Sequence, residues 1–111
     1  MNNWQEQLNH EFERAALARS KNNEGQARVC ARRAAGIAIR ESLTRRRIPL
    51  RSASAVDLLD QLKEDARLPS SLKLAVNHLT LRVTEEFKLP VEADLIAEAR
   101  ALCEWLLPDW K

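Results

Sequence analysis

The sequence has few of the residues that break helices and none of the patterns that form strands. Only two glycines and four prolines occur among 111 residues, and tyrosine is absent. No stretch alternates polar and apolar residues as a half-buried strand does, which argues against a sheet. Ala, Leu, Glu and Arg are abundant instead, and these residues favour helix. At this length we expect a single domain over residues 1–111.

Cysteines and long apolar runs are also scarce. Cys30 and Cys103 are the only cysteines, too few for a disulfide framework and without the spacing of metal ligands. No uncharged run approaches the roughly 20 residues that cross a membrane. The first residues, MNNWQEQLNHEFER, lack the basic and apolar regions of a signal peptide. We therefore expect a cytoplasmic protein with no metal, no cofactor and no membrane partner.

Apolar residues recur at helical spacing and predict an all-α fold, an antiparallel up-and-down bundle of four to five helices. The predicted helices cover about 4–20, 23–44, 54–62, 70–89 and 92–107. Predicted caps are Asn23 with Gln26, Ser54 with Asp57, and Ser70 or Ser71. The positions expected to face inward are Trp4, Leu8, Phe12, Ala15 or Ala16, Val56, Leu59, Leu62, Leu72, Val76, Leu79, Val83, Phe87, Leu95, Ala99, Leu102 and Leu106.

Charge is distributed unevenly along the chain. Residues 26–51, called here the basic segment, hold eight Arg and one Glu, whereas the remainder holds ten Lys or Arg against fifteen acids. Such a segment either binds an external anion or pairs with acids of the same protein or a second subunit. Its arginines are Arg28, Arg32, Arg33, Arg40, Arg45, Arg46, Arg47 and Arg51, the last four in a predicted basic loop over residues 45–53.

Both interpretations of these arginines stay open. Arginine forks suit phosphate better than lysine does, which favours a nucleotide, RNA or an acidic protein as partner. Alternatively the arginines pair with nearby acids, the candidates being Glu85, Glu86, Glu92, Asp94, Glu98 and Glu104. No aromatic residue lies between Phe12 and Phe87, which argues against a platform for stacked bases. Gly36, in the middle of an alanine-rich helix, indicates that another part of the chain approaches the backbone there.

Catalytic signals are weak. His78 lies beside the apolar face of its helix, one turn from Arg82. A histidine and an arginine together can cut RNA, because the imidazole moves the proton of the 2′-hydroxyl while the guanidinium holds the phosphate. A partly buried, hydrogen-bonded histidine is the plainer interpretation.

Several helices are apolar on more than one side. Leu74 and Leu81 lie away from the main apolar face of their helix, and Ile96, Cys103 and Trp105 widen that of the last helix. These extra faces predict a homodimer. A wider core inside the monomer is the alternative.

The order of these signals resembles the HEPN domains, small helical bundles. The resemblance covers roughly residues 12–107 and runs through "AIRESL", "SASAVDLLDQL", "LPSSLKLAVNHLTLRV", "FKLP" and "EADLIAEARALCEWL". It implies a bundle that commonly dimerises and that binds nucleotide or RNA, cleaves RNA without metal, or pairs with a minimal nucleotidyltransferase in a toxin–antitoxin module.

The sequence departs from the nuclease members of that family, which carry Arg, four to six residues, then His. Phe87, Lys88 and Leu89 stand where a histidine should follow Arg82. Upstream of His78 only Lys73 keeps the spacing, and lysine lacks the planar fork. We therefore expect a non-catalytic binding or interaction module. The alternatives are a ribonuclease toxin using His78 with Lys73 or Arg82, and a purely structural dimer whose arginines are all paired.

Overall fold

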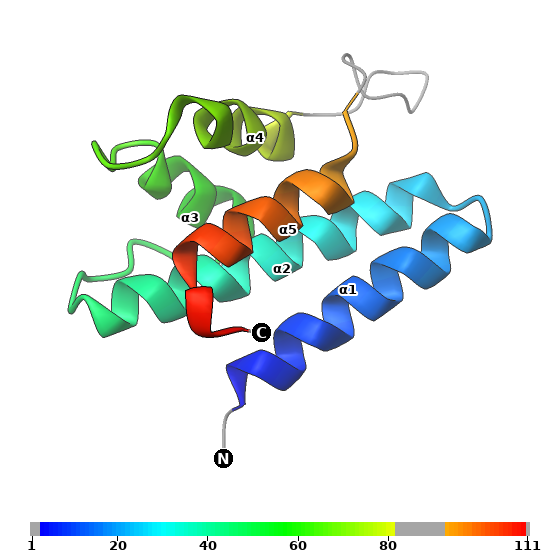
Figure 1. The fold of residues 1–111 in the computed structure, drawn as a ribbon, viewed down its shortest axis with the longest axis horizontal. Coiled ribbons are helices and arrows are strands. Elements are labelled where there is room, and N and C mark those ends of the chain that lie inside the picture. Colours follow the sequence, from blue (N-terminus) through cyan, green and yellow to red (C-terminus); the bar gives the residue numbers. More distant parts are fainter. Residues whose placement is uncertain (1–2, 82–92, 111) are drawn as a thin grey trace.

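The fold is an all-α helical bundle, as predicted. The computed structural model describes residues 3–81 and 93–110. Within them lie α1 (Trp4–Ser20), α2 (Glu24–Arg45), α3 (Ala55–Leu62), α4 (Ser70–Thr80), α5 (Leu95–Leu106) and a short 3-10 helix, η1 (Pro108–Trp110). The described residues contain no strand. The long α2 is the centre of the bundle and contacts all four other α-helices (Figure 1).

One core holds the helices together. Leu8 and Phe12 of α1 meet the alanine face of α2, and leucines of α3, α4 and α5 close over the other sides. The alanines of α2 at positions 27, 31, 34 and 38 are fully buried. Because these side chains are small, neighbouring helices approach the α2 backbone closely along much of its length.

Gly36 is the position where this approach is closest. A Cβ atom at Gly36 would lie 3.0 Å from Ala55 Cβ and 3.2 Å from Ala55 Cα, at the start of α3. Both are tighter than ordinary van der Waals contacts, so the glycine makes room for α3. The prediction that something approaches the backbone at Gly36 is confirmed.

The connection between α1 and α2 is short and fully hydrogen-bonded. Asn22 adopts a left-handed backbone with φ of 59°. Asn22 N–H donates to Arg19 O and Asn23 N–H to Ala18 O, which is the Schellman end of a helix. Asn23 then opens α2, since its side chain accepts from Gln26 N–H at 3.1 Å, as predicted.

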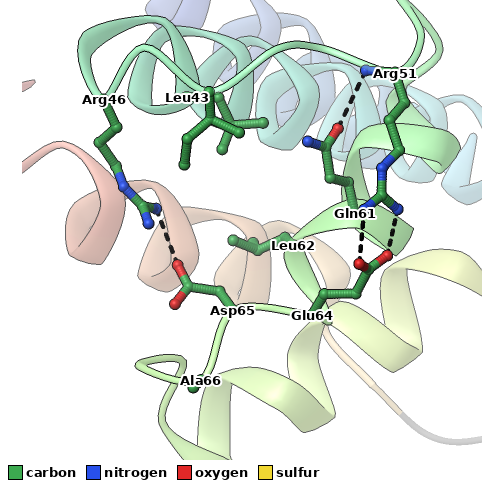
Figure 2. Close-up of a pocket in the computed structure, with 9 residues that line it drawn as sticks. Leu43, Arg46, Arg51, Gln61, Leu62, Glu64, Asp65 and Ala66 are labelled. Carbon is green, nitrogen blue, oxygen red and sulfur yellow. Dashed lines mark hydrogen bonds and ion pairs between the residues drawn. The ribbon is translucent and has the colours of Figure 1, made fainter.

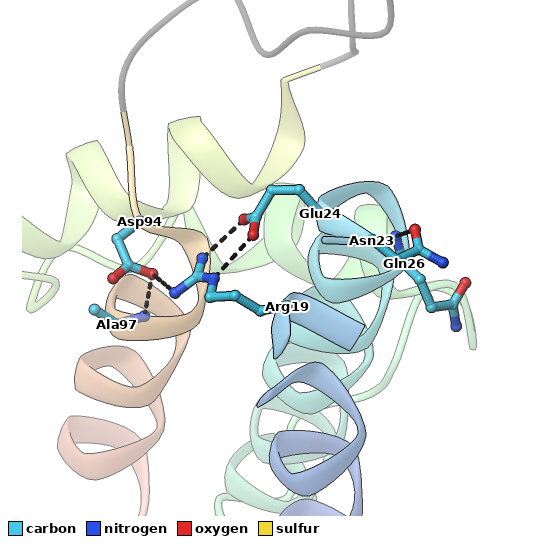
Figure 3. A network of polar contacts seen from close by, with 6 residues as sticks. All are labelled: Arg19, Asn23, Glu24, Gln26, Asp94 and Ala97. Carbon is cyan, nitrogen blue, oxygen red and sulfur yellow. Dashed lines mark hydrogen bonds and ion pairs between the residues drawn. The ribbon is translucent and has the colours of Figure 1, made fainter. Parts of the chain in front are cut away.

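Arg19 ties this connection to α5 (Figure 3). Its guanidinium donates to both carboxylate oxygens of Glu24, at 2.9 and 2.8 Å, and to Asp94 Oδ1 at 2.9 Å. Asp94 also accepts from Ala97 N–H and so caps α5. The hydrogen bonds that Arg19 donates to Glu24 raise the pKa of Arg19. One arginine thus joins the end of α1 to the first turns of α2 and α5.

Three details of the predicted helices are wrong. Val56 is 42% exposed and Leu58 is buried beside Leu59 and Leu62, because α3 begins at Ala55 against Gly36. Helix α4 has no side-chain cap: its N-cap is Pro69, whose carbonyl accepts from Leu72 and Lys73 N–H.

The third wrong detail concerns the ends of the last two α-helices. Helix α4 stops at Thr80 and α5 begins at Leu95, rather than meeting near Pro90. Val83, Phe87 and Pro90, which were expected to extend and end α4, lie outside the described residues.

Candidate nucleic-acid interface

The predicted anion-binding arginines separate into two groups, one in the middle of α2 and one around its C-terminal end. Arg28, Arg32, Arg33 and Arg40 belong to the first group, and Arg45, Arg46, Arg47 and Arg51 to the second. The two groups differ in what their guanidinium groups contact.

Arg32 has a structural role. It is partly buried, and its Nε and Nη2 donate to the carbonyls of Leu79 at 2.7 Å and Leu81 at 2.6 Å. In a longer α4 the Leu79 carbonyl would accept from the N–H four residues on, so at this end of α4 the Arg32 side chain takes the place of that donor. Burial, and secondarily the charge of Arg28, lower the pKa of Arg32.

The other three arginines of the first group are less engaged. Arg40 donates one weak hydrogen bond, at 3.3 Å, to the carbonyl of Ala53 in the basic loop. Arg28 and Arg33 form no hydrogen bond or ion pair with other residues in the described part of the chain. Of their expected acidic partners, Asp94 binds Arg19 and Glu98 contacts His78, while Glu85, Glu86 and Glu92 lie outside the described residues.

Ion pairs and hydrogen bonds hold the basic loop against α3 and the turn after it (Figure 2). Arg46 pairs with Asp65 at 3.0 Å and Arg51 pairs with Glu64. Gln61 accepts from Arg51 N–H at 3.3 Å and donates to the Pro49 carbonyl at 3.1 Å. Between these contacts lies a hollow of about 290 Å³, the loop hollow, whose arginines already have acidic partners.

Asp65 is the centre of this pairing. Hydrogen bonds from Arg67, with a further one from Arg46, lower the pKa of Asp65 to about 2. Its side chain is only 10% exposed. Asp65 therefore stays ionised at neutral pH and holds two guanidinium groups in place.

Arg45, the last residue of α2, is held by acids and by an aromatic ring. It donates to Glu41 at 2.8 Å and to both oxygens of Asp109 at 2.8 and 2.9 Å. Its guanidinium carbon lies 5.1 Å from the centre of a Trp4 ring. The hydrogen bonds that Arg45 donates to Asp109, and then those to Glu41, raise the pKa of Arg45.

Arg47 differs from its neighbours. It has a left-handed backbone with φ of 56°. Arg47 N–H donates to Thr44 O and Ile48 N–H to Leu43 O, so α2 ends in the same Schellman motif as α1. Its side chain is exposed and has no hydrogen-bond or ion-pair partner among the described residues.

A second hollow, of about 350 Å³, lies beside the C-terminal end of α2 and includes two residues that sequence reasoning missed. We call it the Ser42 hollow; its lining is Ser42, Arg45, Arg46, Arg67, Trp105 and Leu106. Arg67 and Trp105 lie far from the basic segment in sequence, and the fold brings both to it. The argument that the basic segment lacks aromatic neighbours is therefore wrong, because it counted only neighbours along the chain.

Of the candidate catalytic residues only His78 and Lys73 are described, and they do not lie on the same face of α4. His78 Nδ1 lies 2.8 and 3.0 Å from the two carboxylate oxygens of Glu98, and both side chains are mostly buried. Lys73 is exposed and lies five residues away on α4, which is about 140° around the helix. Arg82 lies outside the described residues. The plainer interpretation, a partly buried and hydrogen-bonded histidine, is confirmed.

Most of the extra apolar residues are used inside the monomer. Cys103 is fully buried, and burial raises the pKa of its thiol to about 12. Ile96 and Trp105 pack against the core, whereas Leu74 is 56% exposed. The wider core therefore accounts for most of the residues that predicted a second interface.

Comparisons with known proteins identify no relative: no family model matches the chain, and neither curated proteins nor solved structures give a match. In the described residues, no helix is both long and apolar enough to cross a membrane. The resemblance to HEPN domains stays a prediction.

Proposed function

We propose that this protein is a non-catalytic, cytoplasmic binding module whose basic segment contacts the phosphate groups of RNA. The charge of the segment, eight Arg against one Glu, supports an anionic ligand. Arg33 and Arg47 are exposed and form no hydrogen bond or ion pair with the described residues. The proposal also agrees with the resemblance to HEPN domains.

Arg47 is the observation that carries the proposal. A non-glycine residue in left-handed backbone costs about 1 kcal/mol, and glycine is the usual residue at this position of a Schellman motif. The chain places there a long, exposed cation that forms no hydrogen bond or ion pair with the described residues. A side chain that does not serve the fold, at a position where it strains the backbone, is best explained by what it binds.

Two matched variants test this proposal. Arg47→Gly removes the guanidinium and the strain together, and Asn22→Gly relieves the equivalent strain at the end of α1 without changing charge. We expect both variants to unfold at equal or higher urea concentration than the parent. Only Arg47→Gly should weaken binding of a labelled mixed-sequence RNA, and it should reduce the salt dependence of that binding by about one phosphate contact.

Unchanged RNA affinity in Arg47→Gly would remove Arg47 from the interface. Absence of binding even at low salt would contradict RNA as the ligand and favour an acidic protein partner.

A ribonuclease toxin is the alternative that a specific observation favours. The contact between Glu98 and His78 Nδ1 resembles the way a carboxylate orients a catalytic imidazole. Incubation of RNA with the protein and its His78→Gln variant tests it. Cleavage by the parent that is lost in the variant would establish the enzyme, and cleavage unaffected by the variant would exclude His78.

A homodimer is the remaining alternative, and the exposed Leu74 supports it. Light scattering after gel filtration gives the mass directly. A dimer that becomes a monomer on Leu74→Lys would place the interface on α4, and a concentration-independent monomer would exclude it.

A further inference from the structure

The Ser42 hollow has the chemistry of a binding site. Arginines enter it from two separate segments, Arg45 and Arg46 from the end of α2 and Arg67 from the turn before α4, and Trp105 of α5 forms another part of its lining. At about 350 Å³ it has room for one phosphate and one planar ring, and is small for a longer ligand.

Ser42 indicates where a ligand atom would lie. The residue is 8% exposed and is the only buried polar residue among those described. Its hydroxyl forms no hydrogen bond to the described residues, although a serine inside a helix commonly donates to the carbonyl one turn earlier. The hydroxyl oxygen is not among the fully buried, unpartnered atoms of the described residues, so it is open to the hollow. It can therefore donate to an oxygen acceptor bound there.

The arginines retain donors for such an acceptor. A guanidinium has five N–H groups. Arg46 donates to protein through Nη1 alone, to Asp65, and Arg67 contacts the same carboxylate through Nε and Nη2. Arg45 uses Nε, Nη1 and Nη2 toward Glu41 and Asp109. The acids therefore orient the three guanidinium groups, and each guanidinium keeps N–H donors that form no hydrogen bond to the described residues.

Charge balance limits what this hollow selects. The acids that contact its arginines, Asp65, Glu41 and Asp109, are as numerous as the arginines themselves. The hollow therefore offers little long-range attraction to a polyanion, and its ligand must be favoured by the number of hydrogen bonds it accepts. A terminal phosphate monoester carries nearly two charges and three terminal oxygens, whereas an internal diester carries one charge and two. The monoester also ends the strand, so the hollow does not need a second opening through which the strand would leave.

Trp105 supplies the other half of the recognition. It is partly buried against the core, so its ring is held in place. A base or another planar ring stacks on such an indole whatever the nucleotide sequence of the strand. Stacking contributes substantially to the binding of single strands.

We propose that the Ser42 hollow binds the terminal phosphate monoester of a nucleotide or of an RNA strand, with the attached base against Trp105. The monoester oxygens accept from the Ser42 hydroxyl and from Arg46 and Arg67. This inference rests on the proposed RNA binding for its strand form and stands without it for a free nucleotide.

The test compares four probes by titration calorimetry: AMP, and one RNA decamer with a 5′-phosphate, with a 3′-phosphate, or with hydroxyls at both ends. We expect one of the two phosphorylated decamers, either the 5′ or the 3′ form, to bind about tenfold more tightly than the decamer with hydroxyls at both ends. The reason is that its terminal phosphate gains several charge-assisted hydrogen bonds. Ser42→Ala and Arg67→Gln should each reduce that preference severalfold. Arg14→Gln, which removes an exposed cation from α1, should leave the preference unchanged.

The outcomes separate this inference from the proposed function. Equal binding of all three decamers would overturn end recognition and leave RNA binding intact. Binding of AMP that depends on Ser42, without binding of any decamer, would support the hollow and contradict RNA as the ligand. A phosphate preference that survives both Ser42→Ala and Arg67→Gln would overturn the placement of the site, and no binding of any probe would overturn both proposals.

Discussion

The middle of α2 and its C-terminal end use the same residue type for different purposes. In the middle, Arg32 is turned into the bundle and donates to two backbone carbonyls of another segment. At the end, Arg45, Arg46 and Arg47 are exposed, and two of them are held at the surface by acids. Arginine content alone therefore does not identify an interface. Arg32 differs from Arg45 and Arg46 in its acceptors, because it donates to backbone carbonyls of the bundle whereas they donate to carboxylates at the surface.

Replacing the structural arginine should give the largest change. Arg32→Met keeps much of the apolar stem but leaves the Leu79 and Leu81 carbonyls without their charged donor. Loss of these partly buried bonds should lower the free energy of unfolding by about 2–3 kcal/mol. Urea denaturation followed by circular dichroism measures this change. Arg33→Met, one position along, is the control and should shift stability by less than about 0.5 kcal/mol.

The two glycines of α2 distinguish its packed middle from its open beginning. Gly36→Ala would press a methyl group onto the Ala55 backbone and should destabilise the fold by about 1–2 kcal/mol, even after the gain in helix propensity. Gly25→Ala meets no atom closer than 3.9 Å and should stabilise it by about 0.5–1 kcal/mol. Thermal denaturation of both variants measures these two changes in stability. If both proteins were stabilised, the close approach of α3 to α2 would be wrong.

Acid should loosen the C-terminal end of α2. Because Arg67 and Arg46 depress the pKa of Asp65 to about 2 from an ordinary value near 4, ionised Asp65 stabilises the folded state above about pH 4. This contribution, about 1 kcal/mol after allowance for solvent screening, is lost as the pH falls from 4 toward 2. Stability measured against pH for the parent and Asp65→Asn should differ above pH 4 and converge at pH 2. Parallel curves would show that Asp65 is not the group responsible.

Arg40 lies between the two regions and should have the smallest effect. Its single bond to the Ala53 carbonyl is long and exposed, so Arg40→Ala should change stability by no more than about 0.5 kcal/mol. A loss above 1 kcal/mol in urea denaturation would place Arg40 with Arg32 as a structural residue.

The sequence predicts the helices well because their signals are local. Apolar spacing identified each of the five α-helices that the described residues form, and the caps at Asn23 and Ser54 were correct because each depends on residues three apart. The end of α4 could not be predicted in this way. The carbonyls at that end accept from Arg32, which is 47 residues away in sequence from one of them.

The candidate site was predicted only in part for the same reason. The eight arginines formed one visible run, but nothing in their spacing showed that Arg32 faces inward. Arg67 and Trp105 were missed because each is an ordinary residue in its own segment. A weak signal for Ser42 did exist, since it is a polar residue one turn from buried alanines of α2, on the side that packs inward.

Arg32 also makes the length of α4 depend on the position of α2. Two carbonyls at the end of α4 accept from a side chain that emerges from the middle of another helix. If α2 rotated or slid by even part of a turn, those carbonyls would lose their donor and would have to accept from water or from the N–H groups of added helical turns. The boundary of α4 therefore reports the register of α2, and a spin or fluorescent label near Leu81 would detect a shift of α2 without any probe on α2 itself.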